Sequence, residues 1–155
     1  MNPRTLPQLA FLVAIALAGA LAAVQVQAAG RDCVPAVRDA WVRLPPVPMP
    51  MLAGFGRIEN ACAASVVIVG VRSAAFGGVE LHESSVADGI SRMRAVPRLR
   101  LAPRTTRRMQ PGGLHLMLLR PRTMPAVGDT IAVDFDLSDG RTLRGEFVVR
   151  GADGR

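Results

Sequence analysis

After residue 30 the sequence predicts an all-β domain, built as a β-sandwich of two sheets. Three observations predict it. The apolar stretches are short and rich in valine, leucine and isoleucine, they are separated by Gly, Pro, Asn and Asp, and several alternate apolar with polar residues. Short stretches at this spacing, bounded by turn residues, are typical of strands joined by hairpins. No segment after residue 30 has the pattern of a long helix.

The expected strands are separated by recognisable turns. Proline has no N–H to donate to a sheet, so the proline-rich segment 45–50 is expected to be a loop. Asp88-Gly89 is the strongest hairpin signal and should reverse the chain between two strands. Further turns are expected at Gly77-Gly78, Pro111-Gly112-Gly113, 125–129 and Ser138-Asp139-Gly140. Strands are expected at 37–42, 52–59, 65–71, 79–83, 90–96, 114–119, 131–137 and 142–149.

Residues 1–29 have the pattern of a secretory signal peptide. Arg4 precedes an uncharged apolar run at 9–24, and small residues follow as far as Ala29. Cleavage near Ala28 or Ala29 would leave residues 30–155 as one exported domain, which is large enough for a hydrophobic core. A membrane anchor is the alternative, but the run is shorter than the ~20 residues that a spanning helix needs.

The charge of the chain is strongly positive. The formal net charge is +7, and every basic side chain is an arginine. Nucleic acid is not expected as a partner, because the chain is exported and has few aromatic side chains on which bases could stack. The arginines are interpreted as solvated faces, or as a docking surface for an acidic protein or an anionic membrane.

The two cysteines, Cys33 and Cys62, predict a structural disulfide. They are 29 positions apart, which is neither a CxxC motif nor a zinc-knuckle spacing. Outside the cytosol such a pair is usually joined. The alternatives are a redox-active or copper-binding thiol pair, and two free thiols.

Four residues could form a soft metal site: His82, Met93, His115 and Met117. His115 and Met117 are two apart, so on a strand they share a face, and the predicted hairpin brings Met93 back towards His82. Imidazole with thioether suits Cu(I), whereas zinc prefers thiolate, imidazole and carboxylate ligands. The alternative is that the histidines occur by chance and the methionines fill gaps in the core.

The spacing of these residues, H-x10-M-x21-H-x-M, resembles the motif of the PCuAC family of periplasmic copper chaperones. The resemblance extends from residue 37 to about residue 149. It implies a cupredoxin-like, Greek-key β-sandwich that binds Cu(I) through all four residues. The context that also resembles the family comprises Asp39-Ala40-Trp41-Val42-Arg43, Val79-Glu80-Leu81-His82-Glu83, Leu101-Ala102-Pro103, Met109-Gln110-Pro111-Gly112-Gly113-Leu114-His115-Leu116-Met117 and Gly128-Asp129-Thr130.

The resemblance implies a metallochaperone, which is a carrier and not an enzyme. With the predicted signal peptide the protein is expected in the periplasm, and it is expected to be a monomer. Its recipient would be the copper centre of a cytochrome oxidase subunit, with a Sco-type protein as an additional partner. Copper storage or resistance, or a metal-free exported interaction module, are the alternatives. A blue-copper electron carrier needs a cysteine ligand, and neither cysteine lies near the histidine motif. No Ser-His-acid group or carboxylate pair predicts hydrolysis.

The chain departs from the family pattern in two places. Glu83 stands where some members have a methionine after the first histidine, and on a strand it would point to the other face. Residues 149–155 contain no histidine or methionine, so a Cu(II) site in a tail is not expected. Met49 and Met51 are assigned to the proline-rich loop, where they could cover the copper or guide its transfer, with ordinary loop packing as the alternative. Met109 and Met124 are assigned to structure.

Overall fold

The computed structural model of the chain describes residues 33–154, which form strands, turns and bends without a helix. The signal peptide predicted for residues 1–29, and its cleavage near Ala28 or Ala29, lie outside the described residues. No helix in the described part is long and apolar enough to cross a membrane. The ten strands are β1 (Ala36–Arg43), β2 (Met51–Asn60), β3 (Val66–Arg72), β4 (Phe76–Ala87), β5 (Ile90–Ala95), β6 (Leu99–Leu101), β7 (Thr105–Met109), β8 (Leu114–Pro121), β9 (Thr130–Leu137) and β10 (Thr142–Arg150).

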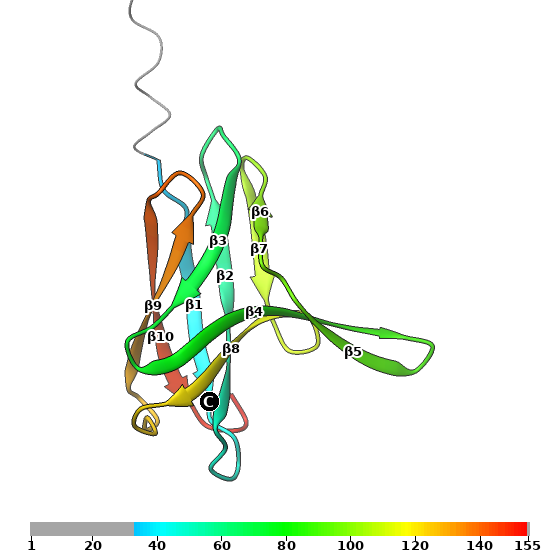
Figure 1. Cartoon of the computed structure of the whole chain (residues 1–155), viewed down its shortest axis with the longest axis vertical. Coiled ribbons are helices and arrows are strands. Elements are labelled where there is room, and N and C mark those ends of the chain that lie inside the picture. The colour runs from blue at the N-terminus through cyan, green and yellow to red at the C-terminus, as the bar shows by residue number, and fades with distance from the viewer. Residues whose placement is uncertain (1–32, 155) are drawn as a thin grey trace, which may run out of the picture. The chain divides into compact units, whose positions relative to one another are not determined.

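All ten strands belong to one hydrogen-bonded sheet, in the order β5-β4-β8-β2-β1-β10-β9-β3-β6, with β7 paired to the second half of β2. The β1–β10 pair is parallel, and the other pairs are antiparallel. The sheet folds over on itself, so that β3 lies beside β4 and β6 beside β7 (Figure 1). The all-β sandwich expected from the sequence is therefore confirmed.

The core is formed by the inward-facing residues of alternating strands. On β9, Val133 and Phe135 are fully buried, while Asp134 and Asp136 face outward. Burial of a large apolar side chain stabilises a fold by about 1.5–3 kcal/mol. On the outer face Arg144 donates two hydrogen bonds to Asp134, and these lower the pKa of the Asp134 carboxyl. The alternation predicted for this segment is confirmed.

Two parts of the strand prediction were wrong. Gly77 and Gly78 do not form a turn but lie inside β4, where a Cβ on Gly77 would come within 3.0 Å of the Arg120 side chain. They allow close approach of a side chain on the neighbouring strand β8. The strands β6 and β7 were not predicted, because Leu99–Leu101 is very short and Thr105–Met109 buries a single residue, Met109.

The hairpin predicted at Asp88-Gly89 is confirmed. Asp88 and Gly89 have φ values of 54° and 74°, the left-handed conformation that a two-residue hairpin turn of type I′ requires. The turn joins the long strand β4 to β5, and this hairpin projects from the body of the sandwich (Figure 1). Every residue of β5 is exposed, so the hairpin forms an arm whose side chains are open to solvent on both faces.

The predicted disulfide is present and joins Cys33 to Cys62, whose Cα atoms are 5.7 Å apart. It ties the segment before β1 to the loop after β2. Asn60 lies beside it and is 1% exposed. The two N–H groups of its side-chain amide are shared among the carbonyls of Ala64, Leu101 and Ala102, and its oxygen accepts from the Cys62 N–H. One buried side chain therefore links four backbone groups of the loops around the disulfide.

We expect Asn60→Leu to destabilise the domain by about 2 kcal/mol, because it leaves buried backbone groups without hydrogen-bond partners. Thr105→Ala is the matched control, since it removes one exposed hydrogen bond to the same Ala102 carbonyl. The control should cost less than about 1 kcal/mol. Urea unfolding of both variants measures the difference, and equal losses would contradict a special role for Asn60.

Candidate metal centre

The four candidate ligands lie on one face of the sheet, opposite the core. His82 on β4 is directly opposite His115 on β8, and Met93 on β5 is opposite Ser84, two residues after His82. Paired residues share a face, as do residues two apart on a strand. Met117 therefore lies on the same face as His115, and Met93 on the same face as His82. The alternate residues of β8, Leu114, Leu116 and Leu118, point into the core.

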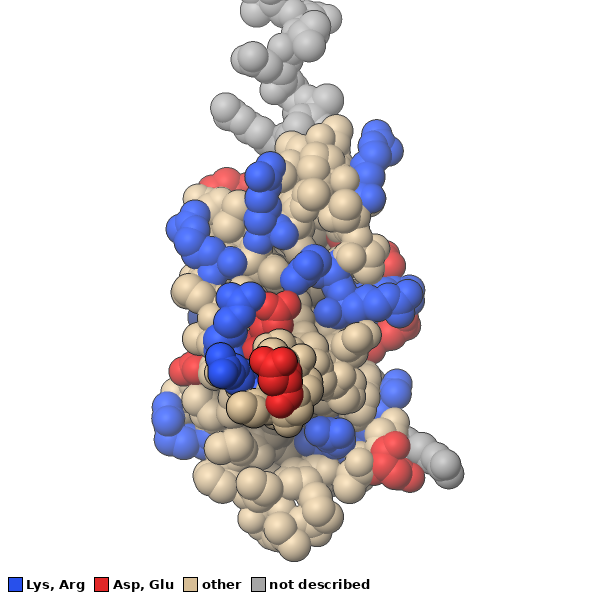
Figure 2. Space-filling model, turned by 90° about the vertical axis from the view of Figure 1, so that its right-hand side faces the viewer, with Lys and Arg blue, Asp and Glu red and all other residues tan. Residues whose placement is uncertain are grey.

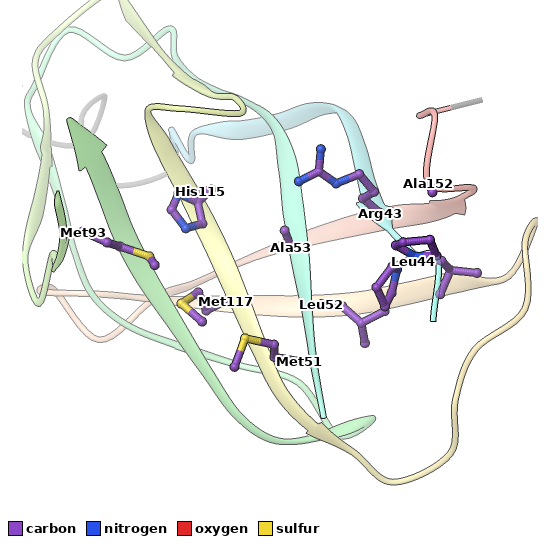
Figure 3. A pocket seen from close by; sticks show the side chains of 11 residues that line it. Arg43, Leu44, Met51, Leu52, Ala53, Met93, His115, Met117 and Ala152 are labelled. Atoms are coloured by element: carbon purple, nitrogen blue, oxygen red, sulfur yellow. The ribbon is translucent and has the colours of Figure 1, made fainter. Parts of the chain in front are cut away.

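A pocket of about 450 Å³ opens on this face and brings together Met93, His115 and Met117 (Figure 3). Ala53 of β2 is directly opposite Met117, and its small side chain leaves room above the sheet. The remaining walls come from the end of β1, the proline-rich loop and the start of β2. These lining residues include Arg43, Leu44, Pro45, Pro46, Met51 and Leu52.

His115 is oriented by the turn that precedes β8. It is 9% exposed, and its Nδ1 lies 2.9 Å from the carbonyl oxygen of Gly113. A carbonyl can only accept a hydrogen bond, so Nδ1 carries the proton and Nε2 keeps a free lone pair. The predicted turn Pro111-Gly112-Gly113 is confirmed, with Gly112 at a φ of 75°. The turn thus presents an imidazole in the form that binds a metal through Nε2.

His82 lies beside the pocket and not in its lining. Its ring centroid is 6.3 Å from that of His115. Its Nε2 lies 2.8 Å from a carboxylate oxygen of Glu80, which assigns the proton to Nε2. Nδ1 is buried and has no hydrogen-bond partner in the described structure. A metal-binding histidine usually donates its other N–H to a carboxylate or carbonyl, and both histidines do so here.

The two predicted thioether ligands differ in exposure. Met93 is 54% exposed on the projecting hairpin, whereas Met117 is half-buried beside His115. The pairing of Met93 with His82 is looser than the sequence suggested, because Ala95 is the residue directly opposite His82. Thioether sulfur and neutral imidazole are soft, uncharged donors, and the set gathered here fits Cu(I).

Glu83 points away from this centre, as expected for the residue after His82. It lies between arginines of two other strands and pairs with Arg94 and Arg107. A methionine at this position would therefore not reach the pocket face. The departure from the family pattern leaves the donor set intact.

Two residues near the centre were missed or misplaced by sequence reasoning. Glu80 was not singled out, although its place two residues before His82 puts it on the same face. Met51 was placed in the proline-rich loop, but it is the first residue of β2 and lines the pocket. Met49, which is 42% exposed, does not line it. Met109 is buried in the core as predicted, and Met124 is 42% exposed.

Basic side chains are concentrated in one stretch of the chain, and one further arginine lines the pocket. Residues 89–128 contain nine arginines and no Asp or Glu. Arg43 lies in the pocket wall, and its Cζ is 5.2 Å from the centroid of the Phe55 ring. Figure 2 shows arginines outnumbering carboxylates on the face that carries the hairpin, while the lower end of that face is uncharged.

These features define a cupredoxin-like β-sandwich with a pocket of soft donors on its outer face. The chain belongs to the LpqE-like family, because the family model described as "Putative lipoprotein LpqE-like" matches residues 35–149. It is similar to "Putative lipoprotein Lxx21020" of Leifsonia xyli subsp. xyli (strain CTCB07), with 32% identity over 107 residues. The match covers 68% of this chain and 63% of that relative's length.

Solved structures with the same fold include PCuAC domains. The copper-bound PCuAC domain from PmoF2 superimposes with a TM-score of 0.61 at 20% identity, covering 74% of this chain and 91% of that chain. The solution structure of CuI-DR1885 from Deinococcus radiodurans gives a TM-score of 0.61 at 27% identity, covering 81% and 85%. The resemblance to the PCuAC family noted in the sequence is confirmed.

Proposed function

We propose that this protein is an exported carrier that binds one Cu(I) ion through His82, Met93, His115 and Met117 and passes it to another protein. The observation that carries the proposal is the pocket that gathers Met93, His115 and Met117 beside the unpartnered Nδ1 of His82. A buried ring nitrogen without a partner is costly, and a bound metal ion would satisfy it.

The donor chemistry favours a carrier of Cu(I) over a fixed zinc site. Thioethers bind soft Cu(I) and have little affinity for zinc, which prefers thiolate, imidazole and carboxylate. The proposed ligands are all neutral, so they do not cancel the charge of the ion as thiolates would. Binding without charge neutralisation leaves the ion open to exchange, which a carrier needs.

The similar proteins support the same function. One PCuAC domain with this fold is copper-bound, and the DR1885 structure contains Cu(I). The disulfide Cys33–Cys62 and the lipoprotein names of the family and relative support export, and we place the protein in the periplasm.

The recipient that we propose is the copper centre of a cytochrome oxidase subunit, with a Sco-type protein as a further partner. The pocket opens beside the exposed loop between β1 and β2, which carries Val47 and Met49 and has no charged residue. Arginines lie around the hairpin on the neighbouring face (Figure 2). An acidic protein could therefore dock against the arginines while its own copper site faces the pocket.

The purified mature protein should bind one Cu(I) per chain in competition with a chromophoric Cu(I) chelator. We expect His115→Ala to weaken binding by at least about 100-fold, because loss of an outer partner alone costs ~10–100-fold. Met124→Leu, on an exposed loop, should change the affinity less than about twofold. Equal losses of affinity in both variants would reject the site. Binding of several copper ions per chain would instead favour copper storage. An intense blue colour with Cu(II) would favour an electron carrier.

A further inference from the structure

The pocket contains one thioether that lies outside the four-residue motif, that of Met51 (Figure 3). In the β2–β8 register Met51 is opposite Leu119 and Ala53 is opposite Met117. Met51 and Met117 are therefore diagonal neighbours on the outer face, at a spacing that long side chains can bridge. The small Ala53 leaves room for Met51 to lean towards Met117.

The pocket presents a different donor set from the motif. Its lining contains three methionines, Met51, Met93 and Met117, together with His115. His82 does not line the pocket, and its Nε2 is hydrogen-bonded to the Glu80 carboxylate. Cu(I) binds three or four soft donors, so both the set with His82 and the set with Met51 can complete its coordination.

We propose that Met51 is a fifth Cu(I) ligand, which replaces His82 while the ion is being loaded or released. This inference rests on the proposed function above. The two donor sets share Met93, His115 and Met117. In the exchange a Cu–S bond to Met51 forms as the Cu–N bond to His82 breaks, and the lone pair returns to Nδ1 of His82. The copper stays Cu(I), and no proton or electron is transferred.

Two of the pocket methionines are more exposed than the two histidines, so the exchange moves copper outward. The side chain of His82 is 18% exposed, and His115 is 9% exposed. Met51 and Met93 are 39% and 54% exposed. Copper that moves from His82 to Met51 therefore moves towards donors that a partner protein can reach.

The first test compares Met51→Leu with Met124→Leu, which is matched in chemistry and exposure (39% and 42%). Both variants are loaded with Cu(I) and mixed with excess chromophoric chelator. We expect Met51→Leu to release copper about tenfold more slowly than the wild-type protein. Its equilibrium affinity should stay within about threefold, because His82 still completes the site. Met124→Leu should behave as wild type.

The second test asks whether Met51 takes the place of His82. His82→Ala should still bind Cu(I), and X-ray absorption should detect three sulfur ligands. The double variant His82→Ala/Met51→Leu should show two sulfur ligands. It should bind Cu(I) at least ~10–100-fold more weakly than His82→Ala, because loss of a residue that merely orients a ligand already costs that much. Adding Met124→Leu to His82→Ala should change neither the sulfur count nor the affinity.

Two results together would overturn the inference. The first is an identical rate of copper release from Met51→Leu and Met124→Leu. The second is a number of sulfur ligands in His82→Ala that stays the same when Met51 is also replaced. Met51→Gln, of similar length but without the thioether, is a second variant in case leucine disturbs the fold, which thermal melting checks. If the wild-type protein fails to bind Cu(I), the proposed function itself is wrong. If it binds Cu(I) and Met51 has no effect, only this inference is wrong.

Discussion

The double variant Met93→Leu/Met117→Leu should bind Cu(I) at least about 1,000-fold more weakly than the wild-type protein. Each substitution removes one thioether from the pocket face. Loss of a residue that merely orients a ligand already costs ~10–100-fold in metal affinity, so loss of two ligands should cost more. The remaining donors would be the two imidazoles and Met51, which cannot restore the original number of ligands. Competition with a chromophoric chelator measures the change.

The fold should survive this double substitution, because leucine is close to methionine in volume and such exchanges usually cost less than about 1.5 kcal/mol. Met49→Leu/Met124→Leu is the matched control, since both methionines are 42% exposed and neither lines the pocket. Thermal melts of the two double variants should agree closely. Wild-type Cu(I) affinity in the Met93/Met117 variant would show that neither thioether is a ligand.

The strands of the fold could be predicted where their own residues decide their structure. In β9 the alternation of Val133 and Phe135 with aspartates fixes a strand with one buried face, whatever lies next to it. In β7 the sequence of Thr105–Met109 shows no such alternation, and the segment becomes a strand through pairing with β2. The turn predicted at Gly77-Gly78 is absent, because these glycines lie within a strand and make room for the side chain of the neighbouring Arg120.

The candidate site was likewise predictable only where local sequence decides the geometry. The shared face of His115 and Met117 follows from their spacing alone, and the hairpin that returns Met93 follows from Asp88-Gly89. The direct pairing of His82 with His115 depends on the register between β4 and β8, which no local pattern encodes. The contribution of Glu80 to the tautomer of His82, and the entry of Met51 into the pocket, depend on side-chain contacts that only the folded chain brings about.

Removal of the disulfide by Cys33→Ala/Cys62→Ala should destabilise the domain by about 3–4 kcal/mol, since the bond closes a loop of 29 residues in the unfolded chain. For a domain of this size, this corresponds to a fall in melting temperature of about 10–15 °C. Alanine is preferred to serine because Cys62 is 4% exposed, and a buried hydroxyl would add a cost of its own.

Copper binding separates the structural role of the disulfide from a direct role of the thiols. Neither cysteine lines the pocket, and Cys62 lies among the loops held by Asn60. The folded alanine variant should therefore bind Cu(I) with the affinity of the wild-type protein at a temperature well below its melting point. Reductant should lower the stability of the wild-type protein towards that of the variant and leave the variant unchanged. A folded variant that had lost Cu(I) binding would instead show that the cysteines, and not only the outer-face pocket, hold the copper.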